Sequence, residues 1–136
     1  IRHCISQGAP KEALQTYLRI RRNGINLLGV VPLILKACAS LSALNHGKAL
    51  HAESIKLGVV FDVMVGTSVV DMYAKCGDIV NSRNMFDYMP QRNVVTWNAM
   101  VGGYMRNGDT KSASVLFERM SIRTAVSWIE MIDGFA

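Results

Sequence analysis

The chain has 136 residues, of which 50% are hydrophobic and 18% are charged. This composition provides enough apolar material for a packed core and argues against disorder, and no apolar run approaches the ~20 residues that a membrane span needs. The formal net charge of +5 suits a polyanionic partner without proving one. Cys4, Cys38 and Cys76 are too few and too widely spaced for a disulfide framework or a zinc knuckle, so we expect free thiols in a reducing compartment.

Paired amphipathic segments recur along the chain. Four short turns, centred on Gly8, Ser42, Gly77 and Gly108, lie about 34, 35 and 31 residues apart. After each turn, apolar residues follow a helical period over "PKEALQTYLRIRRNG", "LNHGKALHAESIKLG", "IVNSRNMFDYMPQRN" and "TKSASVLFERMSIRT". The segments before the turns have the same period. The spacing therefore predicts units of helix, tight turn and helix.

No such unit can bury its apolar face alone, so neighbouring units must stack to form a core. We therefore predict an all-α fold, a right-handed α-solenoid of helix-turn-helix repeats. Large aromatic residues recur at matching places and are expected to pack between units. They are Trp97, Trp128, Tyr73, Tyr104, Phe86 and Phe117.

The string "VGTSVVDMYAKCGDIVNSRNMFDYMPQRN", followed by "VVTWNAMVGGYMRNGD", resembles the pentatricopeptide repeat family of land plants. The subclass it resembles alternates motifs of P, L and S length. The resemblance implies a truncated P motif at 1–27, an L motif at 28–62, an S motif at 63–93, a second short (S- or P-like) motif at 94–124, and the first helix of a further motif at 125–136. A peptide-binding tetratricopeptide array is the alternative solenoid, but the glycine after the first helix and the changing repeat length argue against it.

The two ends of the chain interrupt this pattern. "IRHCISQGAP" begins in the middle of a motif, and "WIEMIDGFA" stops soon after a helix starts. We therefore expect a longer protein, with its targeting segment and any catalytic domain outside this chain.

The family binds single-stranded RNA at about one base per motif. By its pattern, the second residue of a motif is an apolar wedge between bases, and the fifth and last residues read the base. The resemblance implies wedges at Met64, Val95 and Val126. It implies two reading pairs, Thr67 with Asn93 and Asn98 with Thr124.

The first pair implies adenine and the second implies a pyrimidine, with C and U both open. Because RNA runs parallel to the chain in this family, the expected order is 5′-A-Y-3′. Taken alone, Thr or Asn near a helix start is also typical of an N-cap, and this alternative stays open here.

Other positions are weaker candidates. Pro32 and Asp62 occupy the reading positions of the L motif, but proline has no N–H to donate, so both are peripheral. Ile129 stands where the last motif needs a polar reader, and no base is assigned to it. Lys75 and Arg106 recur at one repeat position and are secondary candidates for contacts with the RNA backbone.

"HAE" at His51–Glu53 matches half of a zinc deaminase signature, but the P-C-x-x-C half is absent from the sequence. We expect no enzyme in this segment, no cofactor, no metal site and no small-molecule substrate. The resemblance implies a mitochondrial or chloroplast module that recognises single-stranded RNA, most simply the target site of C-to-U editing. It also implies multiple-site editing factors as partners of the L motif at 28–62. The alternative is a structural solenoid within a larger organellar ribonucleoprotein such as a ribosome, without base-selective reading.

Overall fold

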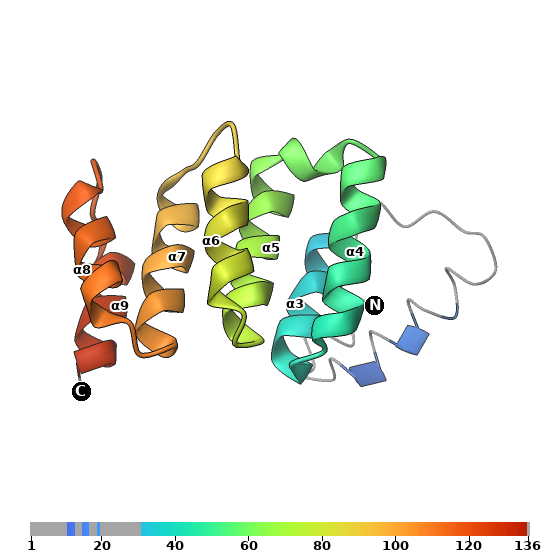
Figure 1. Cartoon of the computed structure of the whole chain (residues 1–136), viewed down its shortest axis with the longest axis horizontal. Helices are drawn as coiled ribbons and strands as arrows, with labels where there is room; N and C mark the ends of the chain where they lie inside the picture. Colours follow the sequence, from blue (N-terminus) through green and yellow to red (C-terminus); the bar gives the residue numbers. More distant parts are fainter. Residues whose placement is uncertain (1–10, 13–14, 17–18, 20–30, 136) are drawn as a thin grey trace.

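The structure is a computed structural model that describes residues 11–12, 15–16, 19 and 31–135, with side chains to residue 132 (Figure 1). The truncated motif expected at 1–27 lies almost wholly outside the described residues, as do its turn residue Gly8 and Cys4. Seven helices and one short 3-10 turn occupy residues 31–135. They are α3 (Val31–Leu41), α4 (Leu44–Lys56), η2 (Val59–Phe61), α5 (Val63–Lys75), α6 (Ile79–Tyr88), α7 (Val94–Arg106), α8 (Thr110–Arg119) and α9 (Ala125–Phe135).

These helices form two layers that run along the long axis of the molecule (Figure 1). The inner layer consists of α3, α5, α7 and α9, each of which packs directly on the next. The outer layer consists of α4, α6 and α8, and within the described part of the chain these helices contact inner helices but not one another. Successive inner helices are therefore closer to one another than successive outer helices are. This difference in spacing bends the stack, so the inner helices line its concave side. The predicted all-α repeat solenoid is confirmed, and none of the helices in residues 31–135 is long and apolar enough to cross a membrane.

The three predicted turns within the described part share one geometry. Ser42, Gly77 and Gly108 each follow an inner helix with a positive φ, of 52°, 84° and 83°. The residue after each of them donates its N–H to a carbonyl five positions back, as Asp78 does to Tyr73 at 2.8 Å. This is the Schellman arrangement, which satisfies the last carbonyls of a helix and requires a left-handed residue. The turn therefore sends the outer helix back antiparallel to the inner one.

Gly77→Ala is expected to lower the free energy of unfolding by about 1–2 kcal/mol, because an L side chain is strained at this φ. A Cβ at Gly77 would meet nothing within 4 Å, so the backbone conformation alone causes the loss. Urea unfolding followed by circular dichroism measures it. Ser42→Gly, at the equivalent turn, is the matched control and should not destabilise the chain. A loss in both variants would contradict this account.

Side-chain caps start four of these helices. The carboxylates of Asp62, Asp78 and Asp109 accept hydrogen bonds from backbone N–H groups in the first turns of α5, α6 and α8. Asn93 does the same for α7, where its side chain accepts from the N–H of Thr96 at 3.0 Å. Such caps satisfy N–H groups that the helix itself leaves unpaired. They also fix where each helix begins.

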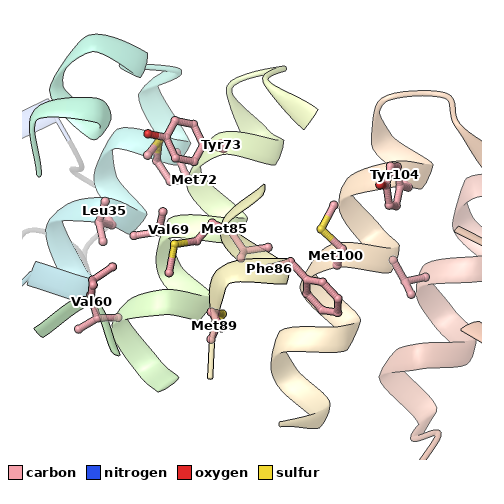
Figure 2. Packing of buried hydrophobic residues seen from close by; sticks show 14 of the residues in the cluster. Leu35, Val60, Val69, Met72, Tyr73, Met85, Phe86, Met89, Met100 and Tyr104 are labelled. Atoms are coloured by element: carbon pink, nitrogen blue, oxygen red, sulfur yellow. The ribbon is translucent and has the colours of Figure 1, made fainter. Parts of the chain in front are cut away.

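The core lies between the two layers and runs without interruption from α3 to α8 (Figure 2). Tyr73, Tyr104, Phe86 and Phe117 are all buried, as expected. Trp97 is half-buried and meets Phe86 of the preceding unit edge-on, with 5.0 Å between ring centroids. The expected packing between units is therefore confirmed for these rings.

Trp128 packs on Phe117 in the same way, at 4.8 Å, but remains 53% exposed. It belongs to α9, which has a described neighbour on one side only. Its exposure follows from that position rather than from a different role.

Candidate nucleic-acid interface

A hollow of about 500 Å³ runs across the inner layer from α3 to α9. It collects side chains from four helices that are distant in sequence, because the inner helices stack side by side. Most of the residues that the sequence singles out for RNA contact on these helices line it. The lining includes Pro32, Lys36, Thr67, Ser68, Asp71, Val95, Asn98, Val126 and Glu130.

The three candidate wedges are exposed apolar side chains. Met64 is 66% exposed, Val95 58% and Val126 51%. They occupy the first turns of α5, α7 and α9, and Val95 and Val126 border the hollow. Exposed side chains of this kind, repeated one per inner helix, provide apolar surfaces against which a base can stack.

The first candidate reading pair is joined by hydrogen bonds through a third residue. Thr67 on α5 lies 2.7 Å from the hydroxyl of Thr96 on α7, measured between the two Oγ1 atoms. Thr96 in turn donates to Oδ1 of Asn93 at 3.1 Å. Thr67 lines the main hollow, whereas Asn93 borders a neighbouring hollow of about 390 Å³ beside Trp97. The structure therefore links the two predicted readers without placing them in one pocket.

The second candidate pair repeats this arrangement. Asn98 on α7 accepts a hydrogen bond through Oδ1 from the hydroxyl of Ser127 on α9. The same Ser127 oxygen accepts from the backbone N–H of Thr124 at 3.1 Å and lies 3.4 Å from its hydroxyl. Asn98 is only 7% exposed, less than a reader on an open surface would be, because α9 packs against α7 beside it.

The peripheral pair of the expected L motif lacks such a link. Pro32 lines the hollow, and Asp62 caps α5 by accepting from the N–H groups of Met64 and Val65. The residue at the place of Thr96 is Val65, which has no hydroxyl. Pro32 and Asp62 therefore have no shared hydrogen-bonding partner of the kind seen at the other two sites.

The two candidate backbone-binding residues differ in their surroundings. Lys75 is paired with Asp71, with 2.9 Å between Nζ and Oδ2. Arg106 is exposed, and the residue one turn before it, Gly102, offers no charge. Arg106 is therefore the better available of the two for a phosphate, although exposed ion pairs such as Lys75–Asp71 cost little to break. Lys36, which the sequence did not single out, also lines the hollow.

Several basic residues of the chain are engaged in packing instead. The guanidinium of Arg92 lies 4.8 Å from the centre of the Phe86 ring, and that of Arg123 lies 4.9 Å from the Phe117 ring. Arg123 also donates to the carbonyl oxygen of Phe117 at 2.9 Å. These cation–π contacts stabilise the ends of the outer helices. Part of the positive charge therefore supports the fold rather than a ligand.

The half-signature His51–Glu53 lies on α4, away from the hollow. Nδ1 of His51 is 2.8 Å from the hydroxyl of Tyr73, and burial lowers the pKa of His51 below its ordinary value. Within the residues that the structure describes, no three His, Cys, Asp or Glu side chains gather as a metal site would require. Cys38 and Cys76 are free thiols there, and burial raises the pKa of Cys38 to about 11.

Sequence reasoning missed the two bridging hydroxyls, Thr96 and Ser127. Each stands three residues after a candidate reader, Asn93 or Thr124, which is the spacing of a helix-capping pair. That spacing could have marked them as cap partners. Their contact with a residue 29 positions earlier could only be seen in the folded chain.

Comparison with known proteins identifies the repeats. The sequence profile described as "PPR repeat" matches residues 67–94 and 95–123. A pentatricopeptide repeat-containing protein of Arabidopsis thaliana is 56% identical over 103 residues, which is 75% of this chain and 20% of the relative. A chloroplastic one from the same plant is 44% identical over 97 residues, covering 71% of the chain and 10% of the relative. A mitochondrial one is 47% identical over 68 residues, covering 50% of the chain and 12% of the relative.

The chain spans a fifth or less of the length of these three relatives. Several similar relatives are named as chloroplastic or mitochondrial.

Proposed function

The chain carries pentatricopeptide repeats, and on this premise we propose that it is a base-selective module for single-stranded RNA within a longer organellar protein. In this proposal the RNA follows the inner layer, with one base at each junction between neighbouring units. We divide the chain as the resemblance implies, into P (1–27), L (28–62), S (63–93) and short (94–124) motifs, followed by the start of another at 125–136.

One observation carries the proposal. At two successive junctions, α5–α7 and α7–α9, a polar side chain of the hollow is linked by hydrogen bonds to the last residue of its own motif. An exposed apolar side chain, Val95 or Val126, stands beside each link. A base needs this combination, because its faces must be stacked and its polar edge must be paired.

The two junctions are proposed to read neighbouring bases in the order 5′-A-Y-3′. Thr67 and Asn93 face the adenine, and Val95 is wedged between the two bases. Asn98 and Thr124 face the pyrimidine. Arg106 and, after release from Asp71, Lys75 contact the phosphates.

In the whole protein, this reading would locate the target cytidine for C-to-U editing. The deamination itself would be performed by a domain elsewhere in the protein or by a second protein, since this segment is proposed only to bind. Editing factors would dock on the expected L motif at 28–62. Exposed apolar side chains there support a protein contact, among them Ile55, Leu57 and Phe61, whose ring stacks on that of Tyr88 at 5.9 Å.

A second candidate function is a structural solenoid without base selection. It is favoured by the capping role of Asn93 and by the low exposure of Asn98, since both side chains already have partners within the fold. Asp71 and Glu130 also line the hollow, where negative charge opposes phosphate.

Selection from a randomised RNA pool with the full-length protein distinguishes the two functions. Base-selective binding predicts an enriched sequence that contains A-Y at adjacent positions, and a loss of affinity of about 1–3 kcal/mol when either base is changed. Affinity that depends on salt and RNA length but not on sequence would favour the structural solenoid.

A further inference from the structure

We propose that the buried hydroxyls of Thr96 and Ser127 are positioning residues that set which atoms each reading pair presents to a base. Each hydroxyl belongs to one unit and orients the readers of the unit before it. This inference rests on the proposed function and adds two specificity-determining residues to it. It also assigns opposite hydrogen-bonding polarity to the two sites.

Thr96 is fully buried, and its hydroxyl oxygen makes three hydrogen bonds. It accepts from the backbone N–H of Asn93 at 3.2 Å and donates to Oδ1 of the same residue at 3.1 Å. Its third partner is the hydroxyl of Thr67, at 2.7 Å. A hydroxyl has one proton and two lone pairs, so these three bonds use all of its capacity.

The proton positions at this site follow from that count. Oδ1 of Asn93 must be an acceptor, because the backbone N–H of Thr96 points at it from 3.0 Å. The single proton of the Thr96 hydroxyl therefore goes to Oδ1. The bond between Thr67 and Thr96 then has to use the proton of Thr67.

As a result, Thr67 offers only lone pairs to a ligand, and Asn93 offers only the N–H groups of Nδ2. The two bonds in series hold Oγ1 of Thr67 and Oδ1 of Asn93 within about 6 Å of each other. With Asn93 facing the ring nitrogen of a base and Thr67 facing its exocyclic group, the site fits an amino base. Adenine has an acceptor at N1 and a donor at N6, whereas a keto purine has the two reversed.

Ser127 orients the reading pair at the junction between α7 and α9, where the two readers present the opposite polarity to a base. It is fully buried, accepts from the backbone N–H of Thr124 and gives its proton to Oδ1 of Asn98. The hydroxyl of Thr124, 3.4 Å away, can then only donate to Ser127. Asn98 is left with its N–H groups and Thr124 with lone pairs, the reverse of the first site.

With the same arrangement of fifth and last residues around the base, the second site fits a keto pyrimidine. Uracil accepts at O4 and donates at N3, whereas cytosine does the opposite. The proposal therefore resolves the pyrimidine to uracil and the order to 5′-A-U-3′.

Helix capping alone does not account for the two hydroxyls. Ser112 makes the equivalent contact in the outer layer, 2.7 Å from Oδ2 of Asp109, the cap of α8. That contact is exposed and stays within one unit. Among the side chains described from residue 31 to residue 132, such a hydroxyl is buried and bonded to a candidate reader of the preceding unit only in the inner layer.

The test uses the full-length protein and short single-stranded RNAs derived from the selected sequence. Adenosine is compared with inosine at the first position, since inosine differs from adenosine by presenting a 6-keto group and a protonated N1. Uridine is compared with cytidine at the second position. Each preference is expected to be at least about fivefold in affinity.

Thr96→Val keeps the shape of the side chain and removes its hydroxyl. It should abolish the preference for adenosine over inosine and leave the preference for uridine over cytidine intact. Ser127→Ala should abolish the uridine preference and leave the adenosine preference intact. Thr96→Ser restores a hydroxyl and should restore the adenosine preference, while Ser112→Ala, the matched loss of a capping hydroxyl, should change neither.

Circular dichroism during thermal unfolding establishes that each variant is folded. If Thr96→Val does not fold, Ser127→Ala still tests the positioning role at the second site, and Thr96→Ser serves as the folded control at the first. Preferences that persist in Thr96→Val and Ser127→Ala would overturn the positioning role and leave the proposed function standing. An equal loss of affinity for every RNA would overturn the positioning role as well, because the hydroxyls would then act only on the stability of the protein. A wild-type protein without either preference would overturn both proposals.

Discussion

Asn93→Asp is expected to cost about 1–3 kcal/mol in affinity for adenine at the first site and to shift the preference toward guanine. The protonated N1 of guanine can donate to the new carboxylate, whereas Thr67, whose proton goes to Thr96, gives none to O6. The exchange replaces Nδ2, which can donate, by an oxygen that can only accept. The other oxygen stays in place to accept from the backbone N–H and hydroxyl of Thr96. Aspartate is as good an N-cap as asparagine, so helix α7 should keep its stability. Competition binding with the full-length protein and RNAs that differ in this one nucleotide measures the change.

The matched control is Asp109→Asn, the reverse exchange at the cap of α8. Asp109 accepts from the N–H of Ser112 at 3.0 Å and belongs to the outer layer. The control changes the net charge by one unit in the opposite direction and should alter affinity equally for all four bases. If Asn93→Asp also weakens all four bases equally, Asn93 is a cap and does not read.

Phe86→Ala is expected to have the largest effect on stability, lowering the free energy of unfolding by about 3–5 kcal/mol. Phe86 is 1% exposed and meets the Trp97 ring of the next unit, while Arg92 covers its face. Truncation leaves a cavity between α6 and α7 and removes the aromatic contact that joins two units. Urea unfolding followed by circular dichroism measures the loss, and hydrogen exchange locates it at these helices.

Two other substitutions bracket this prediction. Val80→Ala lies on the same helix, but Val80 is 68% exposed, so little change is expected. Phe117→Ala removes the equivalent ring one unit later, where the partner Trp128 is half exposed, and should cost less than Phe86→Ala. A cost for Phe86→Ala no larger than that for Val80→Ala would show that stacking between these units does not depend on this ring.

The sequence was most informative where the fold depends on local chemistry. Ser42, Gly77 and Gly108 could be recognised as turns because small residues recur at the repeat interval, and all three have the positive φ that such turns need. The helical period likewise identified buried rings such as Phe86 and Tyr104. The residues that determine a turn or the buried face of a helix lie close together in the sequence, so a sequence pattern is enough to predict them.

Contacts between units were harder to foresee. Asn98, which the resemblance implies as a base reader, is nearly buried, because Ser127 approaches it from the next inner helix. Arg92 covers the Phe86 ring, a contact that the sequence pattern did not indicate. Such contacts depend on how closely neighbouring helices approach each other, which periodicity does not specify. The reading roles of Thr67, Asn93, Asn98 and Thr124 stay predictions that the binding experiments will decide.

The hydrogen bonds from Thr67 to Thr96 and from Ser127 to Asn98 cross the boundaries between sequence repeats. A sequence repeat therefore does not contain all the residues of its own site. Transfer of residues 63–93 into another repeat protein would include Thr67 and Asn93 but not Thr96. A block cut after Thr96 carries the whole hydrogen-bonded set with it. During synthesis on the ribosome, by the same reasoning, the first site is incomplete until the opening turn of α7 has emerged.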